Sequence, residues 1–348
     1  MKVRRNSVAV VAALIVAVVA ALGITAGSGT ASSHQTTFQA ALISDVGRFN
    51  DKSFNQSQLQ GLLRAKAQLK IKALPLQSNS DADYIPNLTT AVRRGSNAVI
   101  CAGFLMADAC AKVVSRSKNV QFAITDYPVQ IAPFANAKGK ILYPNVTGLT
   151  YASQESGCLV GYMAALMAKR AGGKQVIGAV GGIKIPPVDT WIAGYKYCAK
   201  RANKAITVLI GYSQDFVQSD KCKAIAEQQI AQGAKVLFQV AGGCGLGTLK
   251  AADEAGIWGI GVDRDQYNDA KRVMTSGVKR VDVGVYNFIK SAKNGAPLGR
   301  GNLNFDLENG GMDLGRINPA VPKSIVAKTL ALKQLIINGK VTPPLVIK

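Results

Sequence analysis

Carboxylate residues stand directly after several short apolar segments of the chain, where they could bind a ligand. Asp45, Asp126 and Asp263 each end such a segment. An ionised carboxylate accepts hydrogen bonds, and glycine lets backbone amides come close to a bound molecule. Glycines end three further segments, at Gly103, Gly181-Gly182 and Gly242-Gly243.

An aspartate at this position has a second use, because its side chain can cap the helix that follows. Capping alone would explain any one of the three aspartates. In an open parallel sheet, however, the carboxyl ends of the strands share one edge, where loop amides and helix N-termini converge on a ligand. Three aspartates at such an edge therefore favour a binding site.

The strands that must position these residues alternate with longer amphipathic segments, which is the pattern of βαβ units on a parallel sheet. The predicted strands are 40–44, 71–76, 98–102, 121–125, 176–180, 207–211, 235–240, 258–262 and 273–275. The predicted helices are 53–68, 84–94, 107–115, 154–169, 188–201, 220–232, 247–255, 281–292 and 321–337. Nine strands suit two sheets, so we predict an α/β fold of two doubly wound parallel-sheet lobes joined by a hinge.

Two stretches interrupt this alternation and are interpreted as passages between the lobes. The first, 126–148, contains three prolines, and the second, 293–314, is rich in Gly and Asn. The predicted divisions are a first lobe of 38–128 plus 277–299, a second lobe of 145–275 plus 300–318, and a C-terminal helix and tail over 319–348.

Composition and motifs argue against several classes of enzyme. The chain has 348 residues, of which 48% are hydrophobic and 18% charged, as is typical of folded globular proteins. The single histidine, His34, lies near the N-terminus, which argues against Ser/His/Asp triads and histidine-based zinc sites. Neither a phosphate-binding Gly-x-x-x-x-Gly-Lys loop nor a dinucleotide-binding Gly-x-Gly-x-x-Gly motif occurs. We expect no cofactor and no metal.

The N-terminus has the layout of a secretory signal. Three basic residues among the first five precede an apolar run, 8–22, and small residues follow up to Ala31. We predict a signal peptide over 1–31, and an uncleaved membrane anchor is the alternative. The formal charge of +22 comes from scattered basic residues, which favours surface solvation or adhesion to an anionic envelope over nucleic-acid binding. The protein is thus expected to be exported and extracytoplasmic, at the cell envelope or the plasma membrane surface.

Six cysteines in an exported chain indicate disulfides. The absence of a Cys-x-x-Cys pair argues against zinc. Spacing does not choose among the pairings, and buried free thiols are the alternative. Cys101 with Cys110 and Cys198 with Cys222 are two candidate pairs.

Longer motifs surround the strand ends and extend in order over nearly all of residues 38–340. They are Asp45-Val46-Gly47, Asp51-Lys52-Ser53-Phe54-Asn55, Gly103 to Ala109, Gly181 to Pro186, Ala241-Gly242-Gly243, Gly261 to Gln266, and Thr275-Ser276 with Lys279 to Asp282. This set resembles the basic membrane protein family, the substrate-binding proteins of ABC importers that include purine-nucleoside-binding lipoproteins. The resemblance implies a type I periplasmic-binding clamshell, which agrees with the two lobes predicted above.

The resemblance also implies roles for single residues. Phe54 would stack on a base, and we place a second stacking ring on Phe216, with Phe238 and Trp191 as its rivals. Among the polar candidates, Asp45 and Asp126 would accept hydrogen bonds from the base. Asp263 and Lys279 would contact the sugar. Asn55 and the amides of Gly242 and Gly243 would be further donors.

We therefore expect a monomeric, exported solute receptor that closes over one small molecule, a purine nucleoside by family resemblance, and presents it to an ABC permease. It would not be an enzyme and would bind no nucleic acid. A sensory receptor for the same ligands is an alternative. A nucleoside hydrolase is a less favoured alternative, because such an enzyme needs a cluster of acidic metal ligands. Asp263 and Asp265 alone would supply only two of them.

Overall fold

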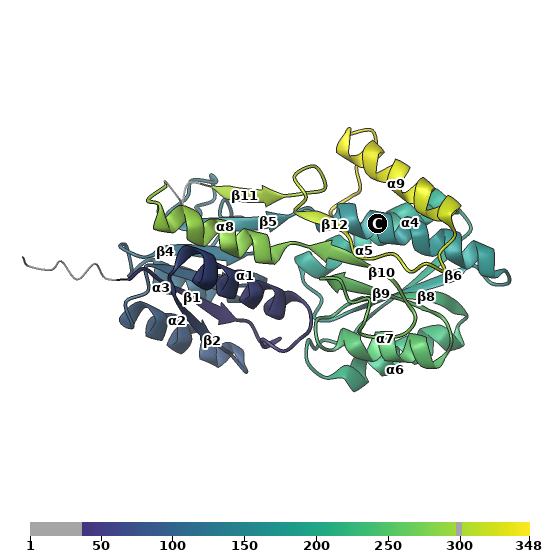
Figure 1. Ribbon diagram of the computed structural model, residues 1–348, viewed down its shortest axis with the longest axis horizontal. Coiled ribbons are helices and arrows are strands. Elements are labelled where there is room, and N and C mark those ends of the chain that lie inside the picture. Colours follow the sequence, from purple (N-terminus) through teal and green to yellow (C-terminus); the bar gives the residue numbers. More distant parts are fainter. Residues whose placement is uncertain (1–36, 297–300) are drawn as a thin grey trace, which may run out of the picture. The chain divides into compact units, whose positions relative to one another are not determined.

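The structure, a computed structural model, describes residues 37–296 and 301–348 (Figure 1). The predicted signal segment, 1–31, lies outside the described residues, as does His34. Within the described part of the chain, every helix is too short or too polar to cross a lipid bilayer.

The first lobe is built on a six-stranded sheet. Its strands are β1 (Gln39–Ser44), β2 (Lys72–Leu76), β3 (Ala98–Ala102), β4 (Gln121–Thr125), β5 (Val146–Tyr151) and β11 (Asn302–Phe305). They lie in the order β11-β5-β4-β3-β1-β2, and all neighbouring strands are parallel. Its helices are α1 (Phe54–Leu69), α2 (Tyr84–Arg93), α3 (Ala107–Val114) and α8 (Val281–Lys293).

The second lobe is built on another six-stranded sheet. Its strands are β6 (Val176–Gly181), β7 (Thr207–Tyr212), β8 (Ala234–Val240), β9 (Trp258–Asp263), β10 (Val273–Lys279) and β12 (Met312–Leu314). They lie in the order β12-β10-β9-β8-β6-β7, and only β12 is antiparallel to its neighbour. Its helices are α4 (Ser153–Ala171), α5 (Pro186–Ala202), α6 (Ser219–Ala231), α7 (Gly245–Glu254) and α9 (Lys323–Ile337).

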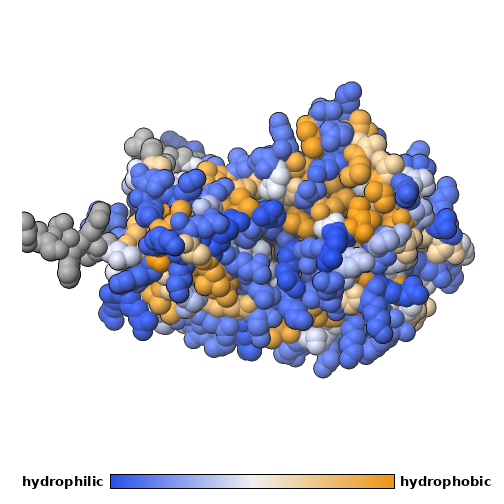
Figure 2. Space-filling view, viewed as in Figure 1, coloured by the Kyte–Doolittle hydropathy of each residue, from blue (hydrophilic) through white to orange (hydrophobic). Residues whose placement is uncertain are grey.

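Helices cover both faces of each sheet, so alternate residues of one strand enter different cores. In β1, Ala40 and Leu42 belong to the core shared with α1 and α8, whereas Ala41 and Ile43 belong to the core shared with α2 and α3. Burial on both sides explains why the central strands are mostly apolar. The outer surface is different: Figure 2 shows a largely hydrophilic face, with apolar side chains gathered near α9.

The predicted α/β fold with two doubly wound sheets is confirmed, and each of the nine predicted strands and nine predicted helices is present. Three strands were not predicted: β5, β11 and β12. They are short or alternate polar with apolar residues, because they lie toward one edge of each sheet.

Some of the predicted lobe boundaries are wrong. Residues 126–148 do not lead to the second lobe, because β5 pairs with β4 in the first sheet. Within the segment 300–318, β11 pairs with β5 in the first sheet, and only β12 joins the second. Residues 277–279 belong to β10 and so to the second sheet. Over residues 37–296 and 301–348, the chain crosses between lobes three times: from β5 to α4, from β10 to α8 and from β11 to β12.

Three disulfides join all six cysteines: Cys101–Cys110, Cys158–Cys198 and Cys222–Cys244. The predicted pair Cys101–Cys110 is confirmed. The pair Cys198–Cys222 is wrong, because these two residues lie on opposite faces of the second sheet. Cys198 is in the core of α4 and α5, and Cys222 is in the core of α6 and α7.

Candidate functional site

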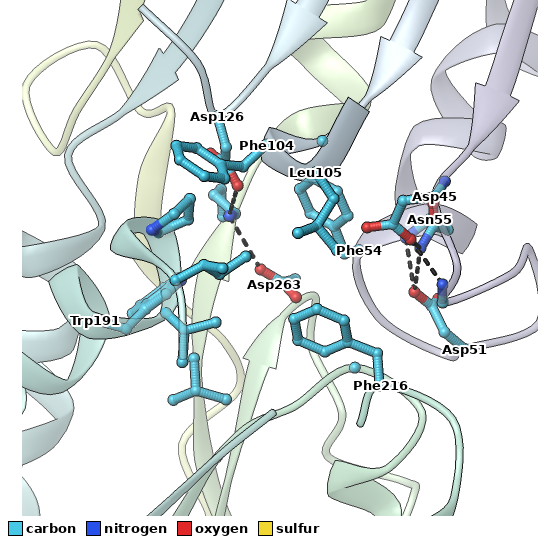
Figure 3. Close-up of a pocket in the computed structure, with 18 residues that line it drawn as sticks. Asp45, Asp51, Phe54, Asn55, Phe104, Leu105, Asp126, Trp191, Phe216 and Asp263 are labelled. Atoms are coloured by element: carbon cyan, nitrogen blue, oxygen red, sulfur yellow. Dashed lines mark hydrogen bonds and ion pairs between the residues drawn. The ribbon is translucent and has the colours of Figure 1, made fainter. Parts of the chain in front are cut away.

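A cavity lies where the strands of both sheets end, as expected for doubly wound sheets (Figure 3). Its volume is about 60 Å³, well below the ~300–1,000 Å³ of common ligand pockets. The lobes are therefore closed on each other and would have to separate to admit a solute. The lining residues are Asp45, Gly47, Asp51, Phe54, Asn55, Gly103, Phe104, Leu105, Asp126, Ile185, Pro187, Val188, Trp191, Phe216, Val240, Gly242, Asp263 and Lys279.

The predicted site residues are brought together with one exception. Gly243 does not line the cavity; it lies beside Phe216 and Asp51, and a Cβ added to it would be 3.3 Å from the Phe216 carbonyl oxygen. The other eight line it: Asp45, Phe54, Asn55, Asp126, Phe216, Gly242, Asp263 and Lys279.

Sequence reasoning missed most of the apolar lining. Phe104 and Leu105 follow β3, and Ile185 and Val188 stand at the start of α5. The available signal was their position just after strand-ending glycines, Gly103 and Gly181-Gly182.

One end of the cavity holds a buried cluster of Asp45, Asp51 and Asn55. The Asn55 side chain donates to Oδ1 of Asp45 at 2.7 Å and to Oδ2 of Asp51 at 3.1 Å, and the Gly47 amide donates to Oδ1 of Asp45 at 2.8 Å. Burial, only partly offset by these donors, raises the pKa of Asp45 to about 7 and that of Asp51 to about 6.

Oδ2 of Asp45 faces Gly103 and the Phe54 ring. A Cβ added to Gly103 would lie 3.2 Å from that oxygen and 3.2 Å from Cε1 of Phe54. Among residues 37–296 and 301–348, no side chain or amide donates to this oxygen. Asp45 thus presents one unused acceptor to the cavity when it is ionised.

The other end holds Lys279 between two carboxylates. Its ammonium lies 2.6 Å from Oδ2 of Asp126 and 3.6 Å from Oδ1 of Asp263, and the Lys279 side chain is 3% exposed. Burial by itself would lower the pKa of Lys279, but the two carboxylates outweigh it and raise this pKa. Burial raises the pKa of Asp126, and Lys279 partly offsets that effect. The ion pairs keep Lys279 charged in a buried place.

The backbone turns sharply at both aspartates. Asp126 and Asp263 have φ angles of 60° and 66°, in the left-handed region that few residues other than glycine, Asn and Asp adopt. This conformation occurs at the first residue after β4 and at the last residue of β9, and it brings both side chains to the same ammonium.

Aromatic rings border the cavity from both lobes. Phe54 is the first residue of α1, and its ring centroid lies 4.7 Å from Nζ of Lys279. Phe216 comes from the second lobe and lies against Gly182, where an added Cβ would be 2.4 Å from the Phe216 ring. Of its two rivals, Trp191 also lines the cavity, whereas Phe238 is fully buried against Trp191 and Tyr195.

The acidic pair considered for a hydrolase does not converge on one point. Asp265 is 3.2 Å from Arg316, whereas Asp263 is directed at Lys279 and Ser53. Across the described residues, no three His, Cys, Asp or Glu side chains are arranged as metal ligands.

Comparison with known proteins gives the family. Residues 38–344 match the family Bmp, the PnrA-like ABC transporter substrate-binding proteins. The chain belongs to this family. It is 32% identical to the ABC transporter nucleoside-binding protein BmpA of Lactococcus lactis, over 99% of both chains, and 31% identical to the CD4+ T-cell-stimulating antigen of Listeria monocytogenes, over 88% of both. An ABC transporter solute-binding protein of Aeropyrum pernix is 26% identical, with a TM-score of 0.77 over 88% of this chain and 94% of that one.

Membership confirms the expected basic membrane protein family and the expected two-lobed fold. Because the family consists of substrate-binding proteins, the expectation of a solute receptor rather than an enzyme is confirmed as well. Proteins of this kind bind small molecules outside the cytoplasm and work with a membrane permease.

Proposed function

We propose that this chain is an exported receptor for a purine nucleoside, or for a related molecule with a flat ring and hydroxyl groups, and that it serves an ABC permease. The nucleoside-binding relative from Lactococcus lactis supports this ligand class. The observation that carries the proposal is the pair of rings, Phe54 and Phe216, which border one cavity from opposite lobes with carboxylates at its ends.

The proposed roles follow from the free polar atoms. The unused Oδ2 of Asp45 would accept a ring or amino N–H of the base. Asn55, expected to donate to the solute, instead donates to Asp45 and Asp51 and holds the Asp45 carboxylate in place. Asp263 and Lys279 would contact the hydroxyl-bearing part. Asp126, which the family resemblance assigned to the base, is paired with Lys279, and we therefore assign it to this part instead. Each Asp263 oxygen has one protein partner, Ser53 or Lys279, which leaves further lone pairs for a diol. The Gly242 amide would be a further donor, since Gly242 lines the cavity.

A thermal-shift screen tests the proposal, because a ligand that binds only the folded protein raises its melting temperature. The purified protein is heated with nucleosides, free bases, pentoses and amino acids. Purine nucleosides are expected to give the largest shift. A larger shift with amino acids or with pentoses alone would contradict the ligand class.

Two phenylalanine variants sharpen the screen. Phe216→Ala is expected to lose most of the nucleoside shift and little stability, because Phe216 is only partly buried. The matched control, Phe238→Ala, removes a fully buried ring and should lose about 3–5 kcal/mol of stability while keeping the nucleoside shift. A full shift in Phe216→Ala would remove that ring from the proposed site.

A further inference from the structure

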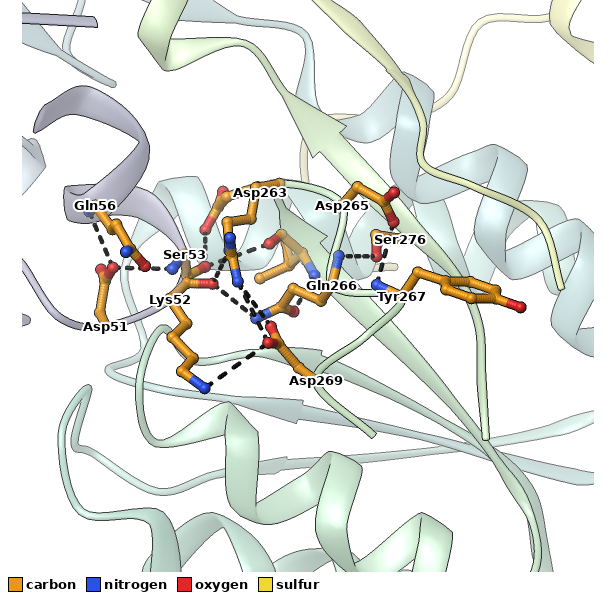
Figure 4. Close-up of polar contacts among 12 residues, drawn as sticks. Asp51, Lys52, Ser53, Gln56, Asp263, Asp265, Gln266, Tyr267, Asp269 and Ser276 are labelled. Atoms are coloured by element: carbon orange, nitrogen blue, oxygen red, sulfur yellow. Dashed lines mark hydrogen bonds and ion pairs between the residues drawn. The ribbon is translucent and has the colours of Figure 1, made fainter. Parts of the chain in front are cut away.

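Two backbone segments at the border of the cavity join the lobes (Figure 4). One is the turn 51–53 that precedes α1 in the first lobe, and the other is the loop 263–269 that follows β9 in the second. Lys52, Arg264 and Gln266 belong to these segments and do not line the cavity. Their contacts therefore bear on closure without requiring a solute.

The Lys52 carbonyl oxygen is the centre of this contact. It accepts hydrogen bonds from Nε of Arg264 at 2.6 Å and from Nε2 of Gln266 at 3.0 Å. Lys52 has a φ of 50°, an unusual conformation for a lysine. The Lys52 carbonyl oxygen, presented by a turn with an uncommon backbone conformation, thus accepts from two side chains of the second lobe.

Both donors are held in place within the second lobe. Oε1 of Gln266 accepts from Nε2 of Gln239 at 2.7 Å and from the Val262 amide at 2.9 Å, and the Gln266 side chain is fully buried. The Arg264 guanidinium pairs with Asp269 at 3.0 Å. Because their geometry is fixed beforehand, these donors lose little conformational freedom when the lobes meet.

Ser53 extends the contact to the cavity. It occupies the N-cap position of α1, yet its side chain makes no capping hydrogen bond; the Asp51 carboxylate accepts from the amides of Ser53, Asn55 and Gln56 instead. The Ser53 hydroxyl donates across the lobes to Oδ2 of Asp263 at 2.7 Å. A residue type that ordinarily caps a helix is used here to join the lobes.

We propose that Arg264 and Gln266 are positioning residues for solute binding: by holding the Lys52 carbonyl they favour the closed lobes, and they set the affinity for every solute by a common factor. The inference rests on the proposed function, binding by lobe closure. A contact made only in the closed form adds the same free energy to any ligand that requires that form. A residue that touched the solute would change affinities unequally.

Arg264→Ala tests the proposal, with Arg272→Ala as its control, since Arg272 is an exposed arginine of the same lobe. Affinities for adenosine and inosine are measured by calorimetry. Arg264→Ala is expected to weaken both by the same factor, roughly three- to ten-fold, through faster dissociation. Arg272→Ala should leave both unchanged. Unequal factors, or unchanged affinity in Arg264→Ala, would overturn the proposal.

A second variant and a second measurement test the same proposal without relying on Arg264→Ala or on nucleoside binding alone. Gln266→Glu keeps the oxygen that accepts from Gln239 and Val262, but it replaces the donor to Lys52 by a carboxylate oxygen that repels the Lys52 carbonyl. Gln232→Glu is its control, because it makes the same charge change at an exposed position. Hydrogen exchange of 45–56 and 262–270 without added solute should be faster in Arg264→Ala and Gln266→Glu than in the wild type. If the wild type binds neither nucleoside, the proposed ligand is wrong. Equal rates of hydrogen exchange in the wild type and both variants would refute the positioning role, whichever solute the protein binds.

Discussion

Asp45 shows, at the scale of one residue, how burial changes what a carboxylate can do. Its place after the first strand was predicted from the sequence, as were the places of Asp126 and Asp263. Its pKa of about 7 was not, because that value depends on the burial of the carboxylate in the folded protein and on a donor, Asn55, ten residues away. The sequence therefore identifies three of the four acidic residues that line the cavity, without Asp51, and it does not indicate their protonation.

The raised pKa of Asp45 predicts a pH-dependent affinity. A solute N–H bound to Oδ2 needs the carboxylate, so the affinity should rise from about pH 6 to about pH 8, and binding should release a proton. Calorimetry in two buffers with different ionisation enthalpies measures both. Asp45→Asn should bind more weakly and without this pH dependence, whereas a flat profile in the wild type would show that Asp45 does not accept from the solute.

The free energy of unfolding of the solute-free protein should decrease as the pH rises, whereas the affinity for solute increases. Asp45 has a folded pKa of about 7 against an ordinary 3.8, so the closed protein holds more protons than the unfolded chain between about pH 4 and about pH 7. Its contribution to stability therefore decreases as the pH rises through that window. Asp51, with a pKa of about 6, acts in the same direction.

At the scale of elements, the sequence predicted the regular helices and the central strands well, because both follow hydrophobic periodicity. It did not predict β5 and β11, whose pairing with each other joins residues about 150 apart in the chain. Nor did it indicate how closely α4 and α5 pack. A Cβ added to Gly161 would lie 2.1 Å from the Tyr195 carbonyl oxygen, and one added to Gly194 would lie 2.0 Å from that of Gln154.

This close approach predicts that Gly161→Ala destabilises the protein although alanine favours helix. The added methyl would push α4 away from α5, and overpacking of this kind costs about 1–3 kcal/mol. Urea unfolding measures the loss. Lys169→Ala, at an exposed position of the same helix, should change the free energy of unfolding little. Equal stability of Gly161→Ala and the wild type would mean that the two helices can move apart freely.

At the scale of the molecule, the presence of two lobes was predicted, but their boundaries were partly wrong. Repeated crossing is a matter of which strand pairs with which, and local sequence does not contain that information. The second passage illustrates this: β10 ends in the second lobe at Lys279, and α8 begins in the first at Val281. Lys279, a cavity residue, therefore sits at a crossing.

The crossings predict the result of truncation. A chain that ends at Lys279 keeps ten of the twelve described strands but loses α8, which buries Val285, Phe288 and Ile289 against the first sheet. It also loses α9, which packs on α4. Such a chain should not unfold cooperatively in urea, since both lobes lack part of their core. A sharp transition with near-native stability would show that the later segments are dispensable.

The three crossings also set when each sheet can be finished during synthesis. The first sheet lacks an edge strand until residue 305 has been made, and the second until residue 314. Domains generally fold as units while the chain emerges, but here neither unit is whole until nearly the last residue leaves the ribosome. If the chain is exported, as proposed above, and leaves the cell unfolded, this arrangement would give it time, because the order of its strands delays the completion of either half.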